Sequence, residues 1–232
     1  MLPWLDDDHP VFPDISTALD DPDGLLAAGG NLHCKTLINA YSRGIFPWYC
    51  DPDPILWWSP NPRCMLKPQD VHISKSMKKL LHKKHYQLSW NTAFTEVITA
   101  CSQPRNYTAE TWISQDIINA YIKLHQQGLA HSVEVWQDNE LVGGLYGIAI
   151  GSAFFGESMF AKASNSSKYA FIHLCQQLAA SGFKLIDCQV ESEHLLSLGA
   201  YTIPRSEFSQ QLKEAIATPP ISKPWEASTD NE

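Results

Sequence analysis

The sequence predicts a mixed α+β fold, with a small N-terminal domain over residues 1–62 and a larger domain over residues 63–232. Three observations support this class. Prolines and tryptophans are too dense between residues 46 and 63 for a long helix. Alternating apolar residues from 131 to 160 predict three antiparallel strands. A helix-periodic stretch followed by the apolar run LIDCQV, residues 185–190, predicts a helix that packs beside one more strand.

The N-terminal region contains one helix signal. A helix is expected from about residue 34 to 43, because Leu37, Ile38 and Tyr41 fall on one side of it and Gly44 can end it. The rest of the region is expected to be turn-rich. The segment FPWYCDPDPILWWSPNPR is expected to wrap this small module as an aromatic loop.

The larger domain is expected to alternate helices with strands. Its three antiparallel strands should turn at Asp138-Asn139 and at Gly151-Ser152, where the residue types favour tight turns. The tail TPPISKPWEASTDNE, residues 218–232, is expected to be loosely held. Helices are expected near residues 74–82, 92–102, 115–127, 165–180 and 206–216, and further strands at 86–90 and 185–190.

Composition narrows the class of protein. The 232 residues are 44% hydrophobic, enough to bury a full core. No run of 18 apolar residues occurs, and MLPWLDDDHP lacks the basic start of a signal peptide, so a cytoplasmic protein that does not enter a membrane is expected. The six cysteines are widely spaced, which argues against a disulfide framework and a structural zinc site.

Positive charge is concentrated in one stretch of an acidic chain. The formal net charge is −8, yet the stretch from Arg63 to His85 holds seven of the 17 basic residues and one of the 25 acidic ones. Such a patch is typical of a protein that holds a phosphate backbone at one place, although a solvated lysine-rich helix face gives the same pattern. The basic candidates are Arg63, Lys75, Lys78, Lys79, Lys83 and Lys84.

Two predicted strands carry acidic or amide side chains where apolar ones are expected. Glu157 follows an apolar run, and Asp187 and Gln189 lie two apart in LIDCQV, so a regular strand would place both on one face. Burying such groups without partners is costly. They either belong to a structural network or line a shared cavity.

The aromatic loop allows two interpretations. Its tryptophans can fill the core, or an exposed Trp48 or Trp112 can offer a flat surface for a nucleobase. Stacking of this kind is typically worth about 1 to 3 kcal/mol per base. A neighbouring lysine patch favours the second interpretation.

Eight colinear segments lie between residues 12 and 208: FPDISTALDDPDGLLAAGGNL, LINAYSRGIFPWY, PILWWSPNPR, TWI, HSVEVW, LVGGLYGIAIGSAFFGESMF, SKYAF and LIDCQVESEHLLSLGAYTIPRSEF. Together they resemble the leucyl/phenylalanyl-tRNA–protein transferase family. The resemblance implies an acetyltransferase-like, or GNAT-like, domain that works without acetyl-CoA or another cofactor. It also implies an enzyme that moves Leu or Phe, and less well Met, from aminoacyl-tRNA to the N-terminal Arg or Lys of a protein, which marks that protein for N-degron degradation. A monomer is expected.

The resemblance also implies roles for individual residues. The catalytic aspartate, glutamine and glutamate of the family match Asp187, Gln189 and Glu157. The aromatic positions at the aminoacyl-adenosine end match Trp48 and Trp112, and Leu145 and Phe154 match the pocket for the Leu or Phe side chain. The basic patch is then expected to hold the tRNA acceptor stem through its phosphates.

The chemistry implied is aminolysis of an ester. An α-amino group has a pKa near 7.7 to 8.0 and is mostly protonated at pH 7, so the site must take its proton. Because an amide is a weak base, we expect Gln189 to orient the amine while Asp187 polarises it or relays its proton.

Two rival classes of protein remain. A coenzyme-A-dependent acetyltransferase needs a glycine-rich pyrophosphate loop, and AKASNSSK offers none. An RNA-binding module without catalysis leaves Glu157 and Asp187 unexplained.

Overall fold

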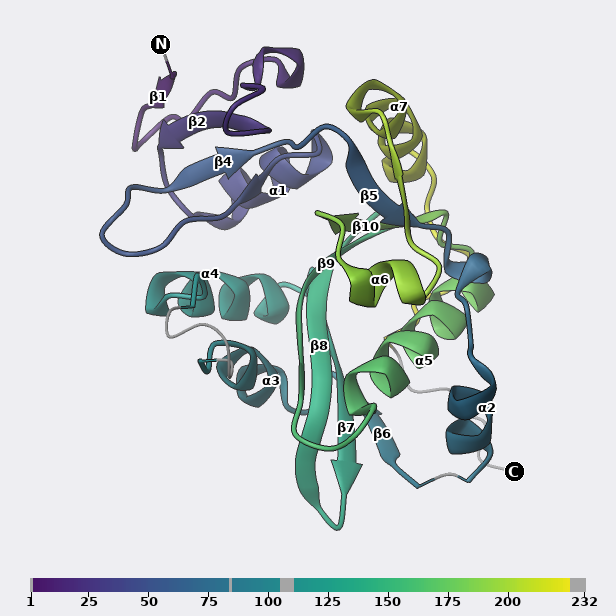
Figure 1. Ribbon diagram of the computed structural model, residues 1–232. Helices are drawn as coiled ribbons and strands as arrows, with labels where there is room; N and C mark the ends of the chain where they lie inside the picture. The colour runs from purple at the N-terminus through teal and green to yellow at the C-terminus, as the bar shows by residue number, and fades with distance from the viewer. Residues whose placement is uncertain (1, 84, 105–110, 226–232) are drawn as a thin grey trace.

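The structure, a computed structural model, describes residues 2–83, 85–104 and 111–225. It contains two sheets with helices packed on them, so the mixed α+β class is confirmed (Figure 1). A four-stranded sheet lies in the N-terminal part, and a seven-stranded sheet forms the rest of the framework. One buried apolar cluster contains residues from both parts of the chain, which joins the two sheets across a common core.

The N-terminal sheet has the strand order β1-β2-β4-β3. Helix α1 (Cys34–Ser42) forms as predicted, and Gly44 follows it at φ +74°, a conformation that favours glycine. The sheet was not predicted, because most of its strands are two or three residues long, too short to show an apolar pattern of their own. Its strands are β1 (Trp4–Leu5), β2 (Leu25–Gly29), β3 (Phe46–Pro47) and β4 (Leu56–Trp58).

The large sheet has the strand order β11-β5-β10-β9-β8-β7-β6. The predicted antiparallel run of three strands is confirmed, and Asp138 and Asn139 turn between the first two with positive φ. Strands β5 and β11 at the opposite edge were not predicted. The strands are β5 (Arg63–Leu66), β6 (Gln87–Trp90), β7 (Ala130–Gln137), β8 (Glu140–Ile150), β9 (Ala153–Ala161), β10 (Leu185–Gln189) and β11 (Tyr201–Ile203).

Helices cover both faces of the large sheet. Figure 1 shows α3 and α4 on one side of β8 and α5 on the other. No helix in the described ranges is long and apolar enough to cross a bilayer. The helices are α2 (Lys75–His82), α3 (Phe94–Cys101), α4 (Gln115–Gln126), α5 (Ser166–Ala180), α6 (Glu193–Ser197) and α7 (Arg205–Ile216), with 3-10 turns at Ile15–Thr17 and Pro68–Asp70.

The large sheet opens between its two parallel neighbours, β9 and β10. They pair only from Leu185 opposite Ala153 to Asp187 opposite Phe155. Beyond that point the pairing of β10 with β5 is irregular, and Gln189 adopts φ +63°, in the left-handed region. Residues that follow the last pair on both strands line a cavity. The cavity therefore lies where the pairing of β9 with β10 ends.

The C-terminal tail differs from its prediction. The backbone N–H of Ile221 donates to Ser181 O at 2.9 Å, and Trp225 packs against a buried apolar cluster. The expectation of a loosely held tail is therefore wrong for the described part, up to residue 225. The proline-rich composition gave no indication of these contacts, since they join the tail to distant segments.

Candidate active site

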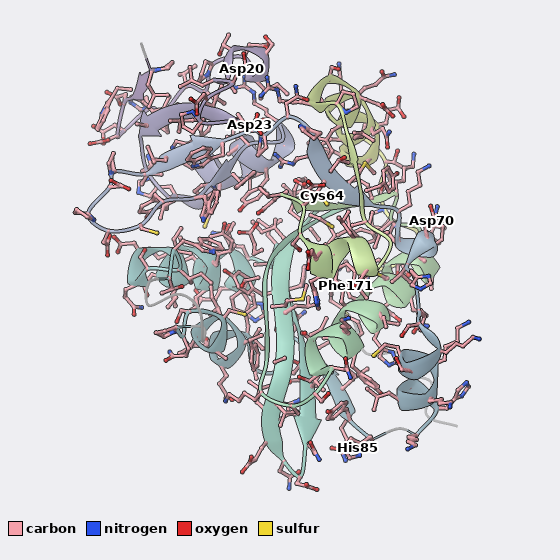
Figure 2. All side chains as sticks on the ribbon, in the orientation of Figure 1. Asp20, Asp23, Cys64, Asp70, His85 and Phe171 are labelled. Carbon is pink, nitrogen blue, oxygen red and sulfur yellow. The ribbon has the colours of Figure 1, made fainter. Side chains whose placement is uncertain are left out.

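A cavity of about 880 Å³ lies where β9 and β10 separate. Its wall combines polar groups, among them Glu157 and Gln189, with apolar side chains from α5 and the sheet. Phe171, labelled in Figure 2, contributes to the wall from α5. A mostly apolar hollow with a few converging polar groups is the usual form of a small-molecule site.

Glu157 is held by three neutral donors. Tyr41 Oη donates to Glu157 Oε1 at 2.7 Å, and Tyr121 Oη donates to Oε2 at 2.9 Å. Gln189 Nε2 donates to Oε1 at 2.9 Å. The hydroxyls of Tyr41 and Tyr121 also contact each other. The carboxylate is therefore stabilised by dipoles from these three side chains, whereas an ion pair would supply a full positive charge.

The hydrogen-bonded network of Tyr41, Tyr121 and Glu157 can hold one proton more than the two tyrosine hydroxyls supply. Tyr41, Tyr121 and Glu157 make three mutual contacts, whereas the two hydroxyls supply two protons. If Glu157 is protonated on Oε2, it donates to Tyr121, Tyr121 donates to Tyr41, and Tyr41 donates to Glu157 Oε1. Each contact then holds one proton. The arrangement is therefore suited to accept a proton on Glu157.

Burial raises the pKa of Glu157 to about 7, because the charged form loses solvation there. The hydrogen bonds from Tyr41 and Tyr121 oppose that rise, and the nearby charge of Asp187 adds to it. Burial also raises the pKa of both tyrosines well above 10, so they stay protonated donors. A carboxyl group with a pKa near 7 can exchange protons at neutral pH.

Asp187 has a different environment. It is fully buried, and both its oxygens accept from Arg63, at 2.8 Å from Nε and 2.6 Å from Nη2. It also accepts the backbone N–H of Gln189 at 2.9 Å and is not among the residues that line the cavity. The prediction that Asp187 and Gln189 present their side chains together is wrong, because Gln189 leaves the regular strand conformation at φ +63°. Asp187 therefore contacts the backbone of Gln189 from outside the cavity.

Arg63 does not belong to the basic surface. Its side chain is fully buried, paired with Asp187, and its guanidinium lies 4.8 Å from the ring centroids of Phe46 and Phe208. The prediction that Arg63 contacts tRNA is therefore wrong. Arg63 begins a basic stretch of sequence, but β5 carries it into the core, away from the lysines that follow.

The four aromatic and apolar candidates all line the cavity. Trp48 is 44% exposed, and its ring lies 5.7 Å from that of Trp58, measured between centroids. Trp112 also lines the cavity and is half-buried. Leu145 and Phe154 are buried and line the same space. Their placement fits a face for a base and a pocket for an apolar side chain.

The lysine candidates form one exposed surface on and after α2. Ser74 caps this helix by accepting from Met77 N, and Met77 turns into the core, which leaves the lysines outside. Lys84 lies outside the described residues. His85, which follows it, is exposed (Figure 2). The exposed members are Lys75, Lys78, Lys79 and Lys83, and none lines the cavity.

Tyr41 and Tyr121 were not predicted as members of the site. Tyr41 falls on the core side of its helix and Tyr121 on the apolar side of α4, and both are fully buried. Periodicity alone cannot separate a core tyrosine from one that donates to a distant carboxylate. Within the described residues, no group of three His, Cys, Asp or Glu side chains could hold a metal ion.

Comparison with known proteins gives a consistent result. The family described as "Leucyl/phenylalanyl-tRNA protein transferase" matches residues 65–213, and its N-terminal domain matches residues 30–61. The chain belongs to this family. Its predicted class, an aminoacyltransferase, follows from that membership. The family resemblance seen in the eight sequence segments is therefore confirmed.

Full-length relatives in the family cover nearly the whole chain. A leucyl/phenylalanyl-tRNA–protein transferase of Nitrosospira multiformis is 55% identical over 216 residues, 93% of each chain. One of Hahella chejuensis is 53% identical over 229 residues, 99% of this chain and 97% of its own. One of Pseudomonas fluorescens is 52% identical over 225 residues, 97% and 99% of the two chains.

Solved structures show only distant likeness. The L-PGS structure from Bacillus licheniformis has a TM-score of 0.39 at 9% identity, and covers 72% of this chain and 53% of its own. A GCN5-related N-acetyltransferase from Kribbella flavida has a TM-score of 0.37 at 10% identity, and covers 76% and 61%. Likeness at this level says nothing about the chemistry of the site.

Proposed function

We propose that the protein transfers Leu or Phe, and less well Met, from aminoacyl-tRNA to the N-terminal Arg or Lys of a protein in the cytoplasm, which marks the acceptor for N-degron degradation. Family membership supports the donor class. The observation that carries the proposal is the carboxyl group of Glu157, with a pKa near 7, in the wall of a cavity that is also lined by apolar side chains such as Leu145 and Phe154.

Glu157 is the proton acceptor in this scheme. The acceptor α-amine attacks in its neutral form, which is a minor fraction at pH 7. Its nitrogen bonds to the ester carbonyl carbon of the aminoacyl-tRNA, the carbonyl electron pair moves onto the oxygen, and the excess N–H proton passes to the Glu157 carboxylate. The bond from the carbonyl carbon to the tRNA 3′ oxygen then breaks, and that oxygen takes the proton back. The hydrogen-bonded network of Tyr41, Tyr121 and Glu157 holds the proton between the attack and the departure of the tRNA oxygen.

Gln189 orients the amine. Its Nε2 donates to Glu157, which leaves its carbonyl oxygen as an acceptor for an amine N–H. Asp187 acts through Gln189, since it accepts the Gln189 backbone N–H and is itself fixed by Arg63. Both Asp187 oxygens accept from Arg63, and Asp187 does not line the cavity, so it serves as a positioning residue.

Donor choice follows from the apolar wall. Leu145, Phe154 and Phe171 enclose a space for an apolar side chain without a branch at Cβ. Discrimination in such a pocket is about 1 to 3 kcal/mol per methylene. We infer that Trp48 and Trp112 hold the terminal adenosine by stacking, and that the α2 lysines contact the phosphates of the acceptor stem.

Acceptor choice follows from charge. Glu157 and the exposed Glu191 line the cavity, whereas the charge of Asp187 is offset by Arg63. An N-terminal Arg or Lys brings a side-chain cation that pairs with a carboxylate.

Glu191→Gln tests this role of charge. The variant is expected to raise the KM for an Arg-terminated peptide a few-fold and to leave the KM for Leu-tRNA unchanged. A peptide KM equal to that of wild type would remove Glu191 from the acceptor site.

We also infer that the chain divides into two units near residue 62 and acts as a monomer. The four-stranded sheet ends with β4 and the seven-stranded sheet begins with β5, and the two family profiles meet at the same place. Light scattering at micromolar concentration tests the second point, with a mass of 26.0 kDa expected.

The function is tested with labelled Leu-tRNA and a peptide that begins with Arg. Peptide-bond formation is expected with this acceptor and not with the same peptide acetylated at its N-terminus, because the acetylated nitrogen is no longer a nucleophile. Val-tRNA and Ile-tRNA serve as donor controls. Transfer of Val or Ile at the rate of Leu contradicts the pocket, and no transfer of Leu contradicts the function.

A further inference from the structure

The chain after α7 returns to the large sheet and is fastened to the end of α5. Ile221 N donates to Ser181 O at 2.9 Å, and Ser222 Oγ donates to Ser181 Oγ at 3.1 Å. Gln177 Nε2 donates to Pro224 O at 3.5 Å. These bonds bring the tail to the sheet immediately before Trp225.

Trp225 then packs among aromatic rings of the sheet and of the loop before β10. It stacks on His131 with ring centroids 4.0 Å apart and planes within 6°. Its centroid lies 6.2 Å from that of Trp90, and 6.4 Å from that of Phe183. Burial lowers the pKa of His131 to about 3, so the stack joins two neutral rings at physiological pH.

The fourth ring beside Trp225 is Phe154, at 5.8 Å between centroids and 36° between planes. Phe154 lines the cavity, whereas Trp225 does not, so Trp225 lies behind it. On β8, Gly147 leaves the room that the Phe154 ring needs: a Cβ at Gly147 would come within 2.5 Å of Phe154 Cζ. The Phe154 ring is thus fixed between the Gly147 backbone and the Trp225 ring.

We propose that Trp225 is a positioning residue that sets the depth of the donor side-chain pocket by holding Phe154, and thereby sets the preference between Leu and Phe donors. This inference rests on the proposed function, since it assigns Phe154 to the donor pocket. It identifies a contribution to specificity from a tail residue that does not itself line the cavity.

The physical consequence of removing Trp225 is a deeper pocket. Trp225→Ala leaves a void behind Phe154, and neighbouring side chains relax partly into such voids. Phe154 can then move away from the cavity. The larger Phe donor gains space, whereas the smaller Leu donor loses contact, so the ratio of their affinities shifts toward Phe by roughly fivefold or more.

The experiment measures binding of leucyl- and phenylalanyl-adenosine, each with an amide in place of the ester, by calorimetry on the full chain. Trp225→Ala is expected to shift the ratio of the two Kd values toward Phe, and Trp225→Phe to return it to within about twofold of wild type. Ile221→Ala is the matched control, because it lies in the same segment and its side chain is 85% exposed; its ratio stays that of wild type.

An unchanged ratio in Trp225→Ala, with both Kd values raised equally, overturns the inference and leaves Trp225 with a role in folding only. If Trp225→Ala does not fold, Trp225→Leu is judged by the same ratio. Wild-type protein that binds neither compound refutes the proposed function, and this inference with it. Wild-type binding with no shift in any Trp225 variant refutes this inference alone.

Discussion

Glu157 and Asp187 are carboxylates on neighbouring strands, and their partners differ. Glu157 is half-buried in the cavity wall, whereas Asp187 is fully buried. Glu157 accepts from two tyrosines and an amide, all neutral, and its pKa is near 7. Asp187 accepts from Arg63 through both oxygens. Neutral donors leave a carboxyl group able to take a proton, whereas a paired cation commits it to structure. The difference supports the proposal that Glu157 takes part in the chemistry while Asp187 holds Gln189 in place.

Breaking the ion pair is expected to have the largest effect. Arg63→Ala leaves the buried charge of Asp187 without its partner, so the free energy of unfolding falls by about 3 to 5 kcal/mol. Urea denaturation measures this loss. The double variant Arg63→Met with Asp187→Leu is the control, since it removes both charges and should recover much of the stability. A loss below about 1 kcal/mol in Arg63→Ala contradicts a structural role for the pair.

Glu157 is expected to make stability depend on pH. Its pKa of about 7 in the folded state lies above the ordinary 4.5, so the folded state holds its proton more tightly. This contribution is fully present below pH 4.5 and is lost as the pH rises to about 7, on the order of 1 to 3 kcal/mol. Glu157→Gln removes this loss. Parallel stability curves for the two proteins between pH 4.5 and 8 would show that Glu157 titrates normally.

Weakening the donors should move the titration of Glu157. The hydrogen bond from Tyr41 lowers its pKa, so Tyr41→Phe raises that pKa above 7 and moves the acid limb of the transfer rate to higher pH. If the pKa rises from about 7 to about 8, the ionised fraction at pH 7, and with it the transfer rate, falls about fivefold. Tyr169→Phe is the control, since Tyr169 is buried in α5 and does not line the cavity. An acid limb that stays in place in Tyr41→Phe contradicts the network.

The smallest effect is expected from the α2 lysines, which leave both carboxylates unchanged. Lys78→Ala with Lys79→Ala should raise the KM for Leu-tRNA several-fold, leave kcat unchanged and reduce the salt dependence of binding by about two charges. Lys213→Ala, on the exposed side of α7, is the control. A fall in kcat with unchanged KM contradicts a role confined to phosphate binding.

Local pattern predicted much of the fold but not its short strands. Helices α1, α4 and α5 and the antiparallel run β7 to β9 follow from periodicity and turn residues within each segment. Strands β3 and β11 have two and three residues and are extended because they pair with other strands, β3 with β4 across the proline-rich loop and β11 with the distant β5. Segments this short contain no full period of the apolar pattern that predicts a strand.

The sequence predicted the site only in part, because it missed Tyr41 and Tyr121 as partners of Glu157. Glu157 and Gln189 do meet in one cavity. The spacing rule that placed Asp187 beside Gln189 assumes a regular strand, and Gln189 departs from it. Arg63 was grouped with its basic neighbours in sequence, although its partner is 124 residues away. Contacts at that distance are set by tertiary pairing, which local sequence does not encode.

The central claim is that Glu157 takes the proton of the attacking amine, and Glu157→Gln tests it most directly. The amide keeps the shape and can occupy the same network without accepting that proton. Glu134→Gln is the matched control, because Glu134 is a fully buried carboxylate held by hydroxyls of Ser89, Thr92 and Ser132, outside the cavity.

In single-turnover transfer from saturating Leu-tRNA to an Arg-terminated peptide, Glu157→Gln is expected to lose about 100-fold or more in rate from pH 6 to 9. Its affinity for Leu-tRNA should stay within about twofold of wild type, and Glu134→Gln should keep the wild-type rate. A Glu157→Gln rate within about threefold of wild type, with the same pH profile, would contradict the assignment of Glu157 as the proton acceptor.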